Sequence, residues 1–174
     1  TGTASVDSTF NQMVFTNIGA GSLGTGFEWD TRNTSNATLR TTNLNFNTGS
    51  NAIFFTSRDT SSTAVLVSSA VVTNGLSEGI YLTGTGSSSL KTRIVGSILT
   101  GNVQGFRAES LGNAAVCARL LGNTSDRYNF AGISTLPILV ENLAALSGPD
   151  NVGATNTTGS VSNAGLDSCG IPPI

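Results

Sequence analysis

The chain has 174 residues, of which 38% are hydrophobic and only 10% charged, and its net charge is −2. It has no basic run that would attract nucleic acid and no apolar stretch near the roughly 20 residues of a membrane helix. It also contains no histidine, which excludes Ser-His-Asp and Cys-His catalysis and removes the commonest metal ligand.

Ser, Thr, Asn and Gly make up nearly half of the chain, yet the composition does not indicate disorder. Disordered chains are usually highly charged and poor in β-branched residues, whereas here short apolar clusters alternate with polar residues. Thr and Val favour strands, and Asn and Gly tolerate the left-handed backbone of tight corners. We therefore expect an ordered all-β domain.

Residues 1–25 contain one strand candidate, Met13–Phe15, followed by a Gly-rich run at 18–24. We interpret this region as an irregular entry coil in which a loop replaces a tight corner. The chain begins at Thr1 and shows no secretory signal. We expect either that a leader has been removed or that the sequence belongs to a longer protein.

Residues 26–135 carry a repeat of about 26 residues. An apolar-x-apolar triad recurs at 27–29, 53–55, 80–82 and 106–108, and Tyr128-Asn129-Phe130 follows at a shorter interval. A small residue precedes the first four triads: Gly26, Ala52, Gly79 and Gly105. Self-similarity of this length is typical of stacked repeats, so we predict a right-handed parallel β-helix, a β-solenoid with about 26 residues per coil.

Side chains alternate along a strand, so the outer members of each triad should point into the core. The two inward rows are then Phe27, Ile53, Ile80, Phe106 and Tyr128, beside Trp29, Phe55, Leu82, Ala108 and Phe130. The outward row is Glu28, Phe54, Tyr81, Arg107 and Asn129. Two outward aromatic residues on consecutive coils mark a candidate assembly or ligand surface, formed by Phe54 and Tyr81 with Glu28 and Arg107.

Two further sets of segments complete each predicted coil. A second strand precedes each triad, at Leu44–Phe46, Ala70–Val72, Ser97–Leu99 and Arg119–Leu121. A fainter third face aligns Leu39 with Leu66, followed by Arg93–Val95 and Val116–Cys117.

The repeat is predicted to end after Thr135. Residues 136–146 are apolar enough to cover an open end of the core, as a short helix or a strand. Residues 153–163 are expected to be extended. We treat 136–174 as a C-terminal segment that caps its own coil or is exchanged with a neighbour.

The two cysteines, Cys117 and Cys169, are 52 residues apart and form no zinc or redox motif. They are either buried free thiols or a disulfide that ties the C-terminal segment to the last coil. The composition resembles that of secreted proteins and favours the disulfide.

Several segments resemble a known class of protein: 115–125, Glu141–Leu146, 157–161 and Cys169-Gly170. They are similar to the C-terminal ends of bacterial cell-surface and secreted proteins with right-handed parallel β-helix repeats. The similarity extends over residues 90–172. It implies an extracellular or cell-surface location, an adhesive or structural role, and no shared catalytic residues.

No catalytic, cofactor or metal site is predicted. Glu28 and Asp30 share a strand face and could be imagined as a glycosidase pair, but two solvated surface acids are the ordinary explanation. We expect a non-enzymatic extracellular structural protein that self-assembles head-to-tail into a homopolymer, as a filament or surface layer, because the ends of a solenoid expose unpaired strands. The alternative is an adhesive or glycan-binding module that uses Phe54 and Tyr81.

Overall fold

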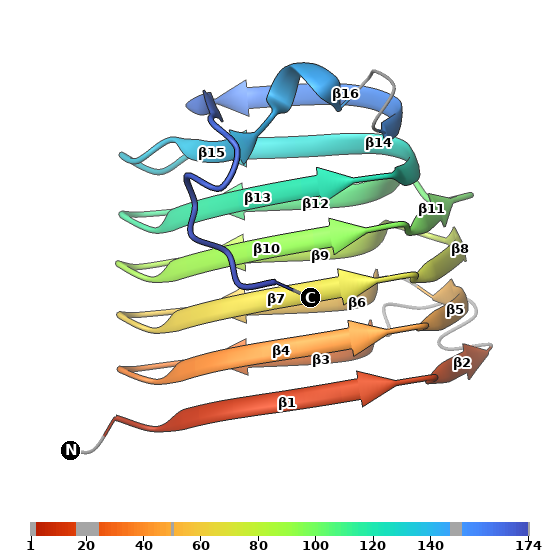
Figure 1. The fold of residues 1–174 in the computed structure, drawn as a ribbon, viewed down its shortest axis with the longest axis horizontal. Coiled ribbons are helices and arrows are strands. Elements are labelled where there is room, and N and C mark those ends of the chain that lie inside the picture. Colours follow the sequence, from red (N-terminus) through yellow and green to blue (C-terminus); the bar gives the residue numbers. More distant parts are fainter. Residues whose placement is uncertain (1–2, 17–24, 50, 147–150, 174) are drawn as a thin grey trace.

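The computed structural model describes residues 3–16, 25–49, 51–146 and 151–173, which form a parallel β-solenoid (Figure 1). The front strands run left to right, and the rear strand β16 (Asn151–Gly159) runs right to left as the chain climbs from the N-terminal end. This path is a right-handed coil, so the predicted fold class is confirmed. The Gly-rich run at 18–24, predicted to be a loop, lies outside the described residues.

Two sheets face each other across the core. The front sheet contains seven strands: β1 (Ser5–Asn11), β4 (Asn36–Thr42), β7 (Ser62–Ser68), β10 (Ser89–Val95), β13 (Ala115–Leu121), β15 (Ile138–Glu141) and β17 (Val161–Ala164). The rear sheet has a narrow wing of short strands: β2 (Val14–Thr16), β5 (Asn45–Gly49), β8 (Val71–Gly75) and β11 (Ile98–Thr100). Its wide wing holds the triads: β3 (Thr25–Thr31), β6 (Asn51–Ser57), β9 (Glu78–Gly84) and β12 (Gln104–Ser110). β14 (Asn123–Gly132) joins the two wings and pairs with β16.

The triads form the predicted rows. Phe27, Ile53, Ile80, Phe106 and Tyr128 lie opposite one another in consecutive parallel strands, as do Trp29, Phe55, Leu82, Ala108 and Phe130. From Ile53 and Phe55 onward every member of these rows is 0% exposed. Alternation of side chains therefore specified which residues enter the core.

One corner of the coil is turned by the same backbone conformation in successive repeats. Asn33 and Asp59 adopt φ of 59°, and Gly86 and Gly112 occupy the equivalent position with φ of 70°. Asn, Asp and Gly are the residues that adopt this left-handed conformation most readily. The Asn- and Gly-rich composition thus supplies the corners between strands.

The small residues before the triads are required by close backbone contact. A Cβ atom at Gly79 would lie 2.6 Å from the carbonyl oxygen of Gly105, and one at Gly26 would lie 2.7 Å from a ring carbon of Phe46. At Gly105 a Cβ would overlap the Ser125 hydroxyl and the Leu99 carbonyl oxygen. Larger side chains here would push neighbouring coils apart.

Two predicted alignments are wrong. Leu39 lies opposite Val65, and Leu66 lies opposite Arg40 and points out of the core. Arg119–Leu121 ends β13 in the front sheet, whereas the true partner of Ser97–Leu99 in the next coil is Asn123–Ser125. The fifth coil is shorter than the fourth between its two rear segments, because Ser125 lies opposite Leu99 while Tyr128 already lies opposite Phe106, and this makes the sequence intervals misleading.

Regular stacking continues beyond Thr135. β15 pairs with β13, β16 pairs with β14, and β17 pairs with β15, so residues 138–141 and 151–164 extend both sheets of their own chain. A one-turn 3₁₀ helix, Leu143–Ala145, lies between β15 and β16. The prediction that the repeat ends at Thr135 is corrected: short β15 and polar β16 hide its continuation in the sequence.

Candidate functional site

The wide wing of the rear sheet brings together the four residues predicted for an assembly or ligand surface. Glu28 lies opposite Phe54, Phe54 opposite Tyr81, and Tyr81 opposite Arg107 on four consecutive strands. Glu28 is exposed and the other three are partly buried. We call this set the rear row.

The aromatic rings of the rear row stack on each other. The Phe54 and Tyr81 centroids are 4.9 Å apart with 19° between ring planes, and the Arg107 guanidinium lies 5.2 Å from the Tyr81 centroid. Phe54 and Arg107 thus lie on opposite sides of the Tyr81 ring along the solenoid axis. The other face of the Phe54 ring is turned toward Glu28 on the neighbouring strand β3.

Two buried carboxylates hold the Arg107 end of the row. Arg107 Nη1 donates to Glu78 Oε1 at 2.9 Å, and Arg107 Nη2 donates to Glu109. The Tyr81 hydroxyl also donates to Glu109. Burial, and then the hydrogen bond to Glu109, raise the pKa of Tyr81 well above its usual range. Sequence reasoning missed Glu78 and Glu109, although both lie at the ends of triad-bearing strands.

Glu28 and Asp30, considered above as a glycosidase pair, make different contacts at the other end of the row. Asp30 is bound by two guanidinium groups, with Arg32 Nη2 at 2.5 Å and Arg58 Nε at 3.1 Å. Glu28 is exposed and takes part in none of these contacts. Asp30 therefore serves an ion-pair network between coils, which is the ordinary role for a surface acid.

Amide side chains continue this surface toward the C-terminal end. Asn129 Nδ2 donates to Gln104 Oε1 at 2.9 Å, and Asn156 Nδ2 donates to Asn129 Oδ1 at 3.4 Å. These amides retain hydrogen-bonding capacity at the surface.

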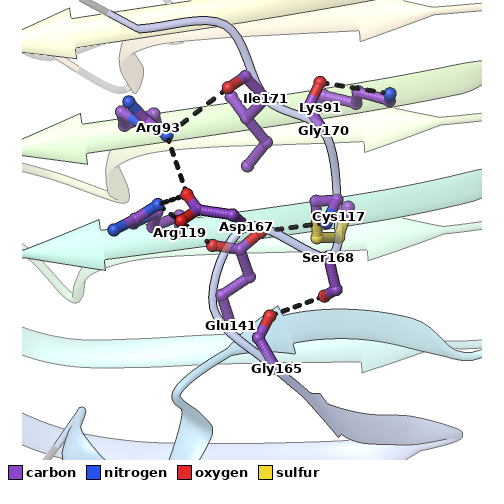
Figure 2. The surroundings of a disulfide bond; sticks show 11 residues. Lys91, Arg93, Cys117, Arg119, Glu141, Gly165, Asp167, Ser168, Gly170 and Ile171 are labelled. Atoms are coloured by element: carbon purple, nitrogen blue, oxygen red, sulfur yellow. Dashed lines mark hydrogen bonds and ion pairs between the residues drawn. A yellow bond between two sulfur atoms is a disulfide. The ribbon is translucent and has the colours of Figure 1, made fainter.

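A second cluster lies on the outer face of the front sheet, where Cys117 and Cys169 form a disulfide (Figure 2). The pairing favoured by the composition is therefore present. Residues 165–173 run back across β13, β10 and β7, nearly perpendicular to the strands (Figure 1). We call this segment the strap.

Charged side chains attach the strap on both sides of the disulfide. The Cys169 N–H donates to Glu141 Oε1 at 3.0 Å, and Asp167 pairs with both Arg119 and Arg93 (Figure 2). The Glu141 side chain is 0% exposed, and Arg119 lies 3.5 Å from its second oxygen. Glu141 was the only charged residue in the apolar run 136–146, a sequence signal for this role.

The end of the strap covers Leu66. Leu66, Cys117, Cys169 and Ile171 form an apolar cluster separate from the main core, in which Leu66 is 0% exposed. Arg93 Nη2 donates to the Ile171 carbonyl oxygen at 3.4 Å. Leu66, an outward residue of β7, is thus buried by Ile171, which lies far away in the sequence.

Two hollows flank the strap. One, of about 280 Å³, is largely apolar and lined by the disulfide with Val116, Leu136 and Leu139. The other, of about 330 Å³, lies between the Gly170–Pro172 end and the polar outer residues of β1, β4 and β7. Neither hollow contains a convergent set of groups suited to catalysis.

The two ends of the solenoid differ in chemistry. At the N-terminal end, Val6 occupies an inward row with Ala37, Thr63 and Leu90, yet it is 42% exposed. Phe10, Met13, Phe15, Phe27 and Trp29 are also only partly buried there. At the other end the rows that begin with Phe27 and Trp29 finish at Thr155 and Thr157 of β16.

Protein-family models, curated protein sequences and solved structures yield no match to this chain. Among the described residues, the structure contains no group of three or more Asp, Glu or Cys side chains that could hold a metal ion. No helix in that part of the chain is long and apolar enough to cross a membrane.

Proposed function

We propose that this chain is a non-enzymatic structural β-solenoid of the extracellular space or cell surface, and that it self-associates through its N-terminal end. The observation that carries this proposal is the contrast between the ends. Apolar inward rows are partly exposed at β1–β3, whereas at the other end the outermost rear strand, β16, continues these rows with Thr155 and Thr157.

The N-terminal end leaves partly exposed the kind of apolar side chains that neighbouring coils bury between them. Phe10 and Phe27 pack edge to face at 5.3 Å, and Phe15 stacks on Phe46 at 4.3 Å. Each coil above buries such side chains against the next coil. An apolar end with unpaired strand edges favours association with another solenoid surface.

An extracellular location is supported by the disulfide. Structural disulfides persist in oxidising compartments and are rare in the cytosol. Cys117 and Cys169 are each only 7% exposed, and their bond links the strap covalently to β13. A protein stabilised by this disulfide is best suited to an oxidising environment.

Sedimentation velocity over a wide concentration range, under oxidising conditions, tests self-association. We expect the mean mass to rise above that of the 17.7 kDa chain as concentration increases. A mass that stays at one chain throughout refutes the proposal.

A second candidate function is binding of a surface glycan by the rear row. Phe54 and Tyr81 form a stacked, partly exposed aromatic pair, and Gln104, Asn129 and Asn156 offer amide groups that hydrogen-bond hydroxyls. Phe54→Ser should abolish binding on a glycan array while leaving self-association intact. Equal binding by wild type and variant, or no binding by either, eliminates this candidate.

A further inference from the structure

We propose that the apolar hollow beside the strap binds a small monocarboxylic acid, whose apolar body contacts Leu136 and Leu139 and whose carboxylate pairs with Lys91. The site lies on the outer face of the front sheet, over the starts of β10 and β13. It uses neither the rear row nor the residues of β1–β3. The inference therefore goes beyond the proposed function and does not depend on self-association.

The hollow forms where small outward side chains lie next to the strap. Ser89 lies opposite Ala115 at the starts of two neighbouring strands, and both are small. Two residues further along, Cys117 lies opposite Leu139 of β15 and is joined to Cys169 of the strap. Because the strap rises above the sheet while the side chains beside it are short, a recess of about 280 Å³ remains between them.

The lining of the hollow suits an apolar ligand. Leu136 is 44% exposed and Leu139 is 37% exposed, and Pro137 and the disulfide complete the apolar surface. A mostly apolar lining with a few polar groups is the usual composition of small-molecule sites, and the volume is near their lower limit. Since a dry apolar cavity of about 150 Å³ is large enough for benzene, this hollow has room for one ring with a short chain.

The Lys91 ammonium provides a positive charge at the edge of the hollow. Its Nζ donates to the Gly170 carbonyl oxygen at 3.4 Å, which is a long hydrogen bond. Figure 2 shows that Arg93 and Arg119 gather around Asp167, while Lys91 lies apart from them beside Gly170. Lys91 forms no ion pair with any residue that the structure describes. This ammonium is therefore available to a carboxylate of a ligand.

The other polar groups of the hollow also favour an anion. Ser89 lies two residues before Lys91 and thus shares its face of β10, where its hydroxyl can donate to the same carboxylate. None of the described residues that line the hollow is acidic. A neutral molecule of the same shape would gain the apolar contacts but not the charged hydrogen bond.

Phenylpropanoate and phenylpropanol are matched probes, because they share an apolar body and differ in the charge of the head group. Their dissociation constants can be measured by ligand-detected NMR, which works for a single chain and for an assembly. We expect a Kd on the order of 1 mM for the carboxylate, a typical value for a ligand of about ten heavy atoms in an open site. The alcohol should bind about tenfold more weakly, since it lacks the charge-assisted hydrogen bond.

Four variants locate the binding site. Lys91→Met removes the ammonium and keeps an apolar chain, so it should weaken binding of the carboxylate about tenfold and leave the alcohol unchanged. Leu139→Ser should weaken binding of both probes roughly fivefold, because both contact the leucine. Arg127→Met and Ile98→Ser are the controls, since these exposed residues lie outside the hollow, and they should change neither affinity. Circular dichroism would confirm that each variant is folded.

The outcomes decide the proposal. A preference for the carboxylate that Lys91→Met abolishes, with both controls unaffected, supports it. Equal affinity for the two probes, no binding at about tenfold the expected Kd, or tight binding of the carboxylate by Lys91→Met overturns it. Should Leu139→Ser fold poorly, Leu136→Ser replaces it with the same expected result. Sedimentation velocity without the probes tests self-association separately, so either proposal can fail while the other stands.

Discussion

The disulfide offers the most direct test of how the strap stabilises the solenoid. In the double variant Cys117→Ser/Cys169→Ser the strap loses its covalent attachment, while Asp167 and Ile171 keep their own contacts. The bond closes a loop with a sequence separation of 52 residues. The chain-entropy relation gives about 4 kcal/mol of stabilisation for a loop of this length. For a chain of this size, that free energy corresponds to a fall in Tm of about 8–16 °C.

Thermal unfolding followed by circular dichroism would measure this change, with hydrogen exchange of residues 165–173 as the local readout. Reduced wild type should behave like the double variant, and the double variant should not respond to reductant. Exchange should rise in the strap and at β7, where Leu66 loses its cover. If Tm falls by less than about 2 °C and the strap stays protected, the side-chain contacts alone hold it and the entropic reasoning is wrong.

Three further predictions concern the packing between coils. Gly105→Ala should cost about 1–3 kcal/mol of unfolding free energy, because its Cβ would overlap Ser125 and Leu99. Gly165→Ala is the matched control, because nothing lies within 4 Å of a Cβ atom there. Equal stability of the two variants in urea would contradict the packing argument. Asn123→Ala should cost about 3 kcal/mol of unfolding free energy in the same assay, because it removes the 2.9 Å hydrogen bonds from the Asn123 side chain to the buried Ile94 carbonyl and from the Ser97 N–H to that side chain. Asn129→Ala, at a partly exposed position, should cost less than about 1 kcal/mol. Burial raises the pKa of Tyr128 to about 12 from its usual 10, so the neutral phenol is favoured in the folded state, and stability that is complete below pH 10 should fall as the pH rises toward 12. Tyr128→Phe should reduce this pH dependence of the unfolding free energy and leave the part that comes from Tyr81, and an unchanged slope would show that Tyr128 does not contribute to it.

The period of the apolar triads was sufficient to predict the solenoid and its inward rows. This success has a physical reason: alternation along a strand and repetition between coils are both local properties of the sequence. The outward position of Glu28, Phe54, Tyr81 and Arg107 followed from the same rule. Their stacking order also followed, because parallel coils place equivalent residues side by side.

Register at the corners was decided only by the tertiary structure. Leu66 looked like a core residue because it is a leucine at the expected interval from Leu39, but it points outward under the strap. The fifth coil reaches Tyr128 by a shorter path; the shorter interval is visible in the sequence, but only the structure shows that the shortening lies between Ser125 and Tyr128. Corner length is set by how coils stack, and a change of one residue there moves every following side chain to the opposite face.

The sequence by itself thus determined the fold class, the repeat and the absence of histidine chemistry. The tertiary structure alone decided how residues 165–173 return across the front sheet, and which end of the solenoid remains apolar. It also decided that Arg107 bridges Glu78 and Glu109. These features join residues on different coils, and their contacts depend on the three-dimensional path of the chain.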